Sequence, residues 1–394
     1  MKHNGFVITK NDAALKSTLS KAAENAVMAL ENSMPHYASG DAYPAHPYQN
    51  GQYTAISNGD IRGSYWTEGF WTGQLWLAYE LTGTEKFRTL AEQNVLDFAK
   101  RVADNFQIDW HHDTGFLYTP SCVSAYKLTG SRQARHAALQ AAYSLARRFR
   151  PRGEFIQSMG AEIEPENYRY IIDTMMNIPL LFWATEETGD ESYRDKGILH
   201  AETTRRNSIR EDVSTYHHML MDFQTAAPKG GTTLQGLSSD SCWSRGQAWM
   251  IYGSALMYAY TDDASWIETF ETVTDYFMAH LPENYIPHWD FSVMGTEDDE
   301  RDSSAAAIAA CGILEMARLT GENEKMTQYV NAAKRMMTSL IDEYAVLPQD
   351  GKEGLISGVV GAKLLNMDDS HGTYGDYFYL EMLVRALTDW KQYW

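Results

Sequence analysis

The chain has 394 residues, 44% of them hydrophobic and 12% aromatic, so it can bury a large core in one big or two medium domains. Its formal net charge of -19 argues against nucleic-acid binding, because neutralising phosphates needs a basic face and the Lys and Arg clusters here are short. No stretch reaches about 18 uninterrupted apolar residues, so no membrane-spanning helix and no membrane partner are expected.

Apolar residues recur with helical period in twelve segments, which predicts an all-α protein of six helical hairpins. In chain order the segments are residues 17–33, 66–81, 85–103, 115–129, 132–148, 171–187, 191–206, 244–260, 264–280, 302–319, 323–343 and 376–392. A short turn recurs between helices, and in four of its five copies Gly ends one helix while a polar residue caps the next. The copies are Leu81-Thr82-Gly83-Thr84, Leu128-Thr129-Gly130-Ser131, Glu187-Thr188-Gly189-Asp190, Tyr260-Thr261-Asp262-Asp263 and Leu319-Thr320-Gly321-Glu322.

The second helix of each predicted hairpin is the more apolar one, as in Trp71-Thr72-Gly73-Gln74-Leu75-Trp76-Leu77-Ala78. A helix that is hydrophobic nearly all round belongs inside, whereas the first helices carry a polar face, for example at Lys334 and Arg335. The pattern therefore predicts two concentric rings of six helices, with the inner six parallel, as a single domain over residues 1–394. Pro179 within residues 171–187 predicts either a kink or the first turn of that inner helix.

Parallel inner helices all begin at the same mouth of such a barrel, so the residues just before them are expected to form one pocket. These residues are Trp66-Thr67-Glu68-Gly69-Phe70-Trp71, His111-His112-Asp113, Ile172-Asp173, Trp243-Ser244-Arg245-Gly246-Gln247-Ala248-Trp249, Arg301-Asp302-Ser303-Ser304 and Tyr374-Gly375-Asp376-Tyr377. Loops add His217 and Gln235. Aromatic rings, carboxylates and an Arg suit a sugar, because pyranose rings stack on indoles and hydroxyls bond to charged groups.

Two aspartates in this set open strongly apolar stretches, Asp113 before Thr114-Gly115-Phe116-Leu117-Tyr118 and Asp173 within Tyr170-Ile171-Ile172-Asp173-Thr174-Met175-Met176. Burial and a neighbouring carboxylate both raise the pKa of a carboxyl group. We therefore expect a poised acid at this pair, while simple helix capping is the alternative function for each aspartate. For Asp302 and Asp376 capping is the favoured interpretation.

The other candidate residues also have structural alternatives. Trp71, Trp76 and Trp183 are predicted to lie in the core, whereas Trp66 and Trp249 are as consistent with a pocket wall as with the core. Arg245 either contacts a substrate or pairs with a carboxylate such as Asp240 or Asp302. His112 and His217 are either site residues or structural histidines.

The three cysteines and the N-terminal segment indicate the compartment. Cys122, Cys242 and Cys311 lie far apart and match no metal-binding or redox spacing, so they are expected to be reduced thiols in the core. Residues 1–15 carry Lys and Asp with no continuous apolar run, so no signal peptide is expected. Together these features predict a cytoplasmic protein.

The ordered motifs resemble those of the unsaturated glucuronyl hydrolases of glycoside hydrolase family 88 across nearly the whole chain, from Trp66 to Tyr377. The resemblance implies an (α/α)6 barrel and release of 4,5-unsaturated glucuronic acid from the non-reducing end of oligosaccharides left by polysaccharide lyases. It implies Asp173 as general acid and base and Asp113 as the second essential aspartate. The residues that it places in the substrate site are Trp66, His112, His217, Gln235, Arg245 and Trp249.

The implied substrate is an enol ether conjugated to a carboxylate, so an acid can protonate its alkene at C4 instead of the glycosidic oxygen. Water then adds at C5, the ionised Asp173 takes the proton of that water, and the hemiketal opens and breaks the sugar bond. Ordinary glycosidases instead place two carboxylates at the anomeric carbon. The hydration chemistry needs no metal ion and no organic cofactor.

The chain departs from the family at the position expected to read a sulfate group. Relatives that favour sulfated glycosaminoglycan disaccharides carry Ser-x-x-Ser-x-Lys, and Gly358-Val359-Val360-Gly361-Ala362-Lys363 keeps only the lysine. Lys363 is still a candidate for contact with an anion. Met159 stands where some members have an aromatic wall.

Three rival functions remain open from the sequence. The first is hydrolysis of unsaturated rhamnogalacturonan fragments of pectin on the same barrel. The second is a conventional inverting glycosidase, which would protonate the glycosidic oxygen and need a separate base. A non-enzymatic helical scaffold is the third, but it does not explain why aromatic, acidic and Arg residues gather at one end of the inner helices.

Overall fold

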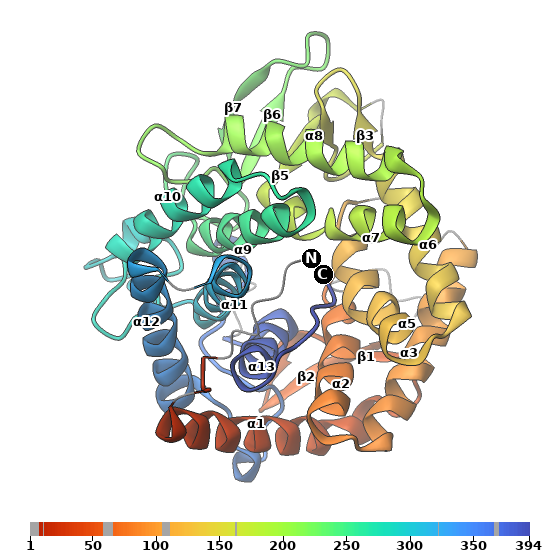
Figure 1. Ribbon diagram of the computed structural model, residues 1–394, viewed down its shortest axis with the longest axis vertical. Coiled ribbons are helices and arrows are strands. Elements are labelled where there is room, and N and C mark those ends of the chain that lie inside the picture. Colours follow the sequence, from red (N-terminus) through yellow and green to blue (C-terminus); the bar gives the residue numbers. More distant parts are fainter. Residues whose placement is uncertain are drawn as a thin grey trace.

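The computed structural model describes residues 8–10, 12–57, 66–104, 111–161, 164–321, 323–365 and 370–394. Its helices form two concentric rings, and each of the twelve predicted segments has a counterpart among these residues (Figure 1). The outer ring consists of α1 (Ala13–Ser33), α3 (Glu85–Ala103), α6 (Arg132–Arg147), α8 (Glu191–Ser208), α10 (Ser265–Ala279) and α12 (Glu324–Ser339). The inner ring consists of α2 (Glu68–Thr82), α4 (Thr114–Tyr118) with its continuation α5 (Ser124–Thr129), α7 (Pro179–Thr188), α9 (Ser244–Thr261), α11 (Ser303–Thr320) and α13 (Thr373–Leu387). The predicted all-α (α/α)6 barrel is confirmed.

The predicted turns join the inner helices to the outer helices that follow them. Gly83, Gly130 and Gly189 have φ angles of 65°, 71° and 74°, the left-handed region in which a residue without Cβ ends a helix at little cost. The side chain of Ser131 then accepts a hydrogen bond from a backbone N–H of α6, as the predicted cap. Glu322 of the last turn and residues 1–7 of the N-terminal segment lie outside the described residues.

The inner segment predicted at residues 171–187 is not one continuous helix. It begins as a 3-10 turn, η4 (Ile172–Met176), and the α-helix α7 starts only at Pro179. Proline lacks an N–H and has a fixed φ, which suits the first position of a helix and not its interior. Pro179 therefore marks the first turn, and Asp173 lies on an irregular segment before the helix.

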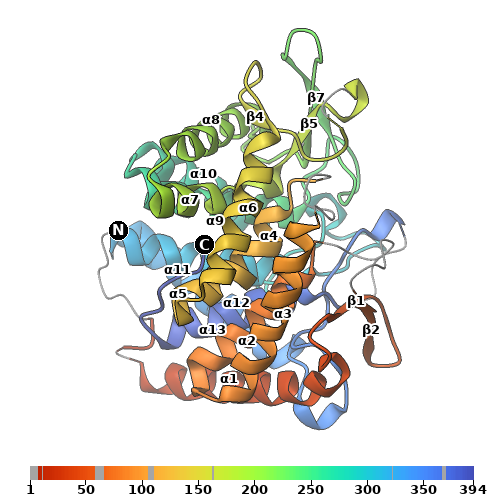
Figure 2. The same ribbon diagram turned by 90° about the vertical axis from the view of Figure 1, so that its right-hand side faces the viewer.

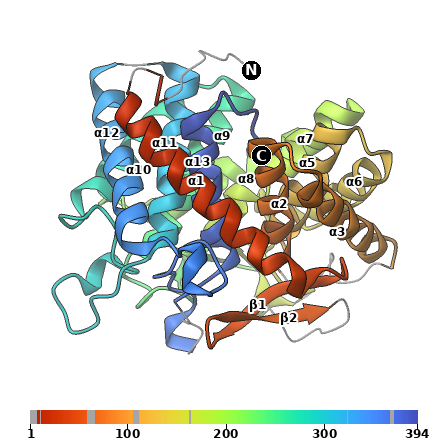
Figure 3. The same ribbon diagram turned by 90° about the horizontal axis from the view of Figure 1, so that it is seen from below.

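The sequence did not predict the small sheets that flank one end of the barrel. The strands β1 (Ala42–Gln49) and β2 (Gln52–Ser57) form a hairpin, and β3 (Phe149–Arg150) pairs with β4 (Phe155–Ile156). The antiparallel strands β5 (Arg169–Ile171), β6 (His218–Met221) and β7 (Pro228–Thr232) form a third sheet. Figure 2 shows β5, β7 and the β1–β2 hairpin on the right, away from the C-terminus, and Figure 3 shows the hairpin at the same end. We call this end the mouth.

Short irregular turns complete the described structure. The 3-10 turns are η1 (Met34–Tyr37), η3 (Pro165–Asn167), η5 (Phe291–Val293), η7 (Pro348–Asp350) and η8 (Lys363–Leu365). The π-turn η2 (Thr119–Val123) links α4 to α5, and a second π-turn, η6 (Leu340–Tyr344), follows α12. The inner helix predicted to end at residue 392 ends at Leu387. The chain beyond it is not helical and crosses the closed end of the barrel.

The core lies between the two rings and inside the inner ring. Trp71, Trp76 and Trp183 are buried in it, as predicted. The three cysteines are buried free thiols, also as predicted. No helix in the described part of the chain is both long and apolar enough to cross a membrane.

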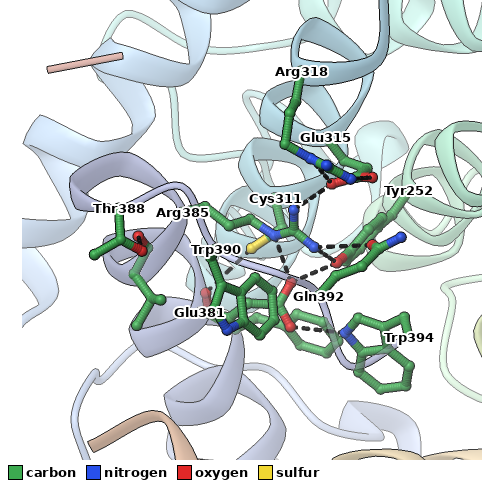
Figure 4. A network of polar contacts seen from close by, with 12 residues as sticks. Tyr252, Cys311, Glu315, Arg318, Glu381, Arg385, Thr388, Trp390, Gln392 and Trp394 are labelled. Carbon is green, nitrogen blue, oxygen red and sulfur yellow. Dashed lines mark hydrogen bonds and ion pairs between the residues drawn. The ribbon is translucent and has the colours of Figure 1, made fainter. Parts of the chain in front are cut away.

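A buried ionic network lies inside the barrel near its closed end, opposite the mouth (Figure 4). Arg385 donates to Glu381 Oε1 at 2.9 Å and also pairs with Glu315, which binds Arg318 in turn. The indole N–H of Trp394 donates to Glu381 Oε2 at 2.7 Å. Buried ions are tolerated only when each is paired and hydrogen-bonded, so this network depends on all its members.

Replacing Arg385 with Met is expected to lower the free energy of unfolding by about 3–5 kcal/mol, because Glu315 and Glu381 would lose a buried cation. Urea denaturation measures this loss. Lys325→Met removes one positive charge from a half-exposed ion pair with Glu271 and serves as the matched control, with an expected loss of about 1 kcal/mol or less. Equal losses for the two variants would contradict the assigned role of the network.

Candidate active site

Polar residues at the starts of the inner helices meet at the mouth, as the sequence predicts. The hydroxyl of Thr373 at the start of α13 donates to the carbonyl oxygen of Thr67 before α2 at 3.2 Å. The guanidinium of Arg245 at the start of α9 contacts Ser304 at the start of α11 at 3.3 Å. Segments far apart in the sequence therefore share one end of the barrel.

Asp113 precedes α4, but its carboxylate does not cap that helix. Oδ2 lies 3.3 Å from His111 Nδ1 and Oδ1 lies 3.4 Å from His112 Nε2. Burial raises the pKa of Asp113, but His112 and the hydrogen bonds from His111 and Asn177 outweigh burial, so the pKa is lowered from its usual value. Asp113 is therefore an anion at neutral pH, and capping does not explain its position.

Asp173 lies on η4, between the short strand β5 and α7. Its Oδ1 is buried and accepts no hydrogen bond from any described residue. Burial is the main cause that raises the pKa of Asp173 to about 7, and the charge of Asp113 raises it further while Arg245 opposes the shift. Asp113 is therefore ionised, whereas Asp173 keeps its proton close to neutral pH. The apolar residues around the two aspartates in the sequence predict a raised pKa for one of them.

Gly115 and Asn177 hold the two aspartates close together. A Cβ at Gly115 would lie only 2.3 Å from Asn177 Cα, so the absence of a side chain lets α4 approach the start of α7. Asn177 Oδ1 accepts from the Phe116 N–H at 2.8 Å, and Nδ2 donates to the Asp173 carbonyl oxygen at 3.2 Å. Asn177 was not predicted from the sequence, although an amide four residues after Asp173 and just before a helix start is a signal for such a link.

Both candidate histidines are neutral at pH 7. Burial lowers the pKa of His112 to about 4, and the ring lies between Thr174 Oγ1, at 2.5 Å, and Asp113. Burial also lowers the pKa of His217 well below its usual value. Because His217 Nδ1 accepts from the backbone N–H groups of Leu234 and Gln235, its Nε2 carries the proton and is a neutral donor.

Arg245 is buried and largely occupied by the protein itself. Its guanidinium pairs with Asp302 and donates to the Val360 carbonyl oxygen at 2.6 Å and to Gln235 Oε1 at 3.1 Å. Of the two alternatives for Arg245, pairing with a carboxylate is therefore the one observed, and Asp302 is the partner. The Nε–H of Arg245 has no hydrogen-bond partner among the described residues, so one donor of this cation is still available.

Aromatic rings form one wall of the mouth and continue into the core. Trp66 is half-buried and stacks on Tyr374, with ring centres 4.9 Å apart. Trp249 is fully buried and packs against Phe116 with ring centres 5.3 Å apart. Of the two ambiguous tryptophans, Trp66 is thus the one with an exposed surface, and its aromatic neighbour Tyr374 belongs to the set of residues predicted to form the pocket.

Of the two aspartates expected to cap helices, only Asp302 does so in the structure. The side chain of Asp302 accepts from the Ser304 N–H at 3.1 Å, which confirms capping there. The capping prediction for Asp376 is wrong, because this residue lies within the first turn of α13. Its carboxylate instead accepts from the N–H groups of Leu355 and Ile356 and from Tyr53 at 2.8 Å. A cap depends on neighbours in sequence, whereas this network depends on residues brought together by the fold.

Lys363 lies beside the mouth, on the segment whose carbonyl groups hold Arg245, and it pairs with Asp298 and Glu300. Within the described ranges no group of three His, Cys, Asp or Glu residues is arranged to hold a metal ion. The functional roles predicted for these site residues, and the absence of a cofactor, stay predictions.

Comparison with known proteins places this arrangement in a family. The profile of Glycosyl Hydrolase Family 88 matches residues 41–390. The chain is 40% identical to the unsaturated chondroitin disaccharide hydrolase of Streptococcus pneumoniae, over 96% of this chain and 94% of that protein. The crystal structure of the unsaturated glucuronyl hydrolase from Bacillus sp. GL1 is similar with a TM-score of 0.88 and 38% identity, covering 93% of this chain and 96% of that one.

A mutant of the unsaturated glucuronyl hydrolase from Streptococcus agalactiae, complexed with dGlcA-GalNAc6S, is similar with a TM-score of 0.82 and 35% identity. The similarity covers 100% of both chains. The expected family and the expected barrel are both confirmed by these matches. The chain belongs to glycosyl hydrolase family 88 and is a glycoside hydrolase.

Proposed function

We propose that the protein is an unsaturated glucuronyl hydrolase that releases 4,5-unsaturated glucuronic acid from the non-reducing end of lyase-generated chondroitin or hyaluronan oligosaccharides. The observation that carries this proposal is Asp173, whose buried carboxyl group has a pKa of about 7 beside the ionised Asp113. Such a pair supplies a proton and later accepts one at the same place. The relatives named for unsaturated chondroitin and glucuronyl substrates support the same activity.

The first step is protonation of the substrate at C4. The carboxyl proton of Asp173 is transferred to this carbon, the electrons of the C4=C5 bond form the new C–H bond, and positive charge develops at C5 and the ring oxygen. Asp173 Oδ1 has no hydrogen-bond partner among the described residues, so none of these residues competes with the substrate for this atom. The nearby anion Asp113 favours the protonated form of Asp173 and stabilises the cation that develops.

The second step is addition of water at C5. The water oxygen bonds to C5, and the ionised Asp173 takes a proton from that water, which restores the acid. The product is a hemiketal, which opens to a ketone and leaves a hemiacetal at C1 that releases the leaving sugar. The catalytic carboxylates do not act at the anomeric carbon, so their separation does not decide the stereochemistry, as it does in ordinary glycosidases.

Binding of the uronate ring uses the groups around the pair. Trp66 supplies an exposed aromatic face for stacking, and His217 supplies the neutral Nε2–H donor. The free Nε–H of Arg245 and the amide of Gln235 are the donors for the substrate carboxylate. His112 supports the Asp113 carboxylate through the 3.4 Å contact of its Nε2, and Trp249 packs against Phe116 behind the site. The single catalytic domain and the cytoplasmic location stay predictions from the sequence.

The purified protein is expected to abolish the ultraviolet absorbance of unsaturated chondroitin or hyaluronan disaccharide, because hydration removes the C4=C5 bond conjugated to the carboxylate. A spectrophotometer measures this loss, and chromatography detects the released sugar. Cleavage of saturated glycosides with no change in absorbance would instead indicate a conventional glycosidase. An unsaturated rhamnogalacturonan disaccharide assayed at the same concentration tests the pectin alternative, and faster turnover of that compound would replace the proposed substrate.

A further inference from the structure

Tyr374, the second residue of α13, is buried, and its hydroxyl group has no hydrogen-bond partner among the described residues. Several other buried tyrosines do have an acceptor. Tyr53 donates to Asp376 at 2.8 Å, and Tyr118 donates to a backbone carbonyl oxygen at 3.1 Å. Leaving a buried hydroxyl group unpaired costs free energy, so a tyrosine of this kind at the mouth is a candidate for binding a ligand.

A second unpaired donor lies beside this hydroxyl group. Trp66 stacks on the Tyr374 ring, with ring centres 4.9 Å apart, and Arg245 Cζ lies 4.9 Å from the centre of the same ring. The Nε–H of Arg245 also has no hydrogen-bond partner among the described residues. A phenolic O–H and a guanidinium N–H therefore both need an acceptor, and a carboxylate offers two acceptor oxygens.

Both donors interact electrostatically with the proposed general acid. Burial and the charge of Asp113 raise the pKa of Asp173, and Arg245 is the cation that opposes this shift. Burial is also the main cause that raises the pKa of Tyr374 to about 12, and Asp173 is one of the carboxylates that add to the shift. Tyr374, Arg245 and Asp173 therefore belong to one site.

The proposed reaction brings an anion to this site. Asp173 protonates C4 of the unsaturated ring, and the carboxylate of the substrate is attached to C5, the next ring atom. A ring with C4 at Asp173 therefore carries its own carboxylate into the neighbourhood of Tyr374 and Arg245.

A neutral donor is useful for binding this anion. The charge of Arg245 is balanced by its ion pair with Asp302, so the pair offers no net positive charge to a carboxylate. With a raised pKa, Tyr374 keeps its proton at neutral pH. Its hydroxyl group can therefore donate to the anion as a directed hydrogen bond.

We propose that Tyr374 is a substrate-binding residue, whose hydroxyl group donates a hydrogen bond to the carboxylate of the unsaturated glucuronate beside the Nε–H of Arg245. This inference rests on the proposed function, because the anion is the carboxylate of that substrate. The carboxylate is conjugated to the C4=C5 bond, so two donors that hold it also orient the plane of the alkene towards Asp173.

Tyr374→Phe tests this hydrogen bond, because it removes only the hydroxyl oxygen. KM for an unsaturated chondroitin disaccharide is expected to rise about 10- to 100-fold, the range for a hydrogen bond to a charged group, with a smaller change in kcat. The melting temperature is expected not to fall, since the variant removes an unpaired buried hydroxyl group. A purely structural role predicts the opposite result, a lower melting temperature with no selective change in KM.

A neutral analogue identifies the group that Tyr374 binds. The same disaccharide with its C6 carboxylate converted to a carboxamide keeps the shape but not the charge, and it is assayed as a competitive inhibitor. Its inhibition constant is expected to change by no more than about threefold in Tyr374→Phe. Equal weakening for the acid and the carboxamide, an unchanged KM for the acid, or a loss confined to kcat overturns the inference alone.

Tyr377→Phe is the matched control. Tyr377 lies one turn further along α13 and is also buried, but the carboxylate that acts most strongly on its hydroxyl group is Glu381 of the buried ionic network. This variant is expected to keep KM within about threefold of the parent value. Equal increases in KM for the two variants would reveal a general effect on α13 and overturn the inference. A parent protein inactive on the unsaturated disaccharide overturns the proposed function and the inference with it.

Discussion

Asp173→Asn is expected to lower kcat on an unsaturated disaccharide by at least about 10³-fold, because one side chain serves both proton transfers and general acid or base catalysis contributes 10²–10⁴-fold to each step it assists. An amide of the same shape cannot give a proton to C4 or take one from water. KM is expected to change much less, since Asn keeps the size of the side chain. Stopped assays at high enzyme concentration, followed by absorbance, measure the residual rate.

The matched control is Asp376→Asn, at a second buried carboxyl group whose pKa is also raised by burial, to about 6. The carboxylate of Asp376 accepts hydrogen bonds from Leu355, Ile356 and Tyr53, and the proposed mechanism gives it no proton transfer. This variant is expected to lose stability but to keep activity within about tenfold. Activity retained in the Asp173 variant, or equal losses in both variants, would assign the proton transfer to another group.

Stability gives a second and independent readout for Asp173. Its pKa is about 7 in the folded protein and 3.8 in the unfolded reference, so the folded state binds the proton more tightly between these values. The contribution of Asp173 to stability is therefore fully present below pH 3.8 and is lost as the pH rises through about 7, because its carboxyl group must then ionise in the folded protein. Asp173→Asn removes this penalty, on the order of 4 kcal/mol for a pKa raised from 3.8 to about 7, and is expected to raise the melting temperature at pH 8.5 relative to the parent protein.

Local patterns in the sequence predicted the barrel because they follow from local physics. Helical period and Gly turns depend on residues a few positions apart, and the parallel inner helices then bring Asp113 and Asp173 to one end. The apolar surroundings of Asp173 also predicted its raised pKa, since burial is the main cause of that shift.

Partners brought together by the fold could not be predicted in the same way. The pairing of Lys363 with Asp298 and Glu300 joins two segments far apart in the sequence through side-chain ion pairs that no local pattern records. Asn177 is similar, because its link to Phe116 depends on a close approach at Gly115. The small sheets at the mouth were also missed, as their strands are short and lie among helical segments.

Asp113→Asn is expected to lower kcat/KM by about 10²–10³-fold and to move the alkaline limb of the pH profile to lower pH. In the parent protein activity needs Asp173 protonated, so kcat/KM is expected to fall as the pH rises through about 7. The anion at Asp113 raises the pKa of Asp173, and removing its charge lowers that pKa, although burial keeps it above the usual value. A smaller fraction of Asp173 is then protonated at neutral pH. The cation that develops at C5 of the substrate also loses the stabilising negative charge of Asp113.

Profiles of kcat/KM between pH 4 and 8 on the unsaturated disaccharide measure this shift. The acid limb of the parent protein reports protonation of Asp113, whose pKa is lowered, so this limb is expected to lie below the usual range of an aspartate. The Asp376→Asn variant should keep the alkaline limb of the parent, because Asp376 does not contribute to the raised pKa of Asp173. A loss of activity in the Asp113 variant with an unmoved limb would show that Asp113 acts by holding the sugar and not through its charge on Asp173.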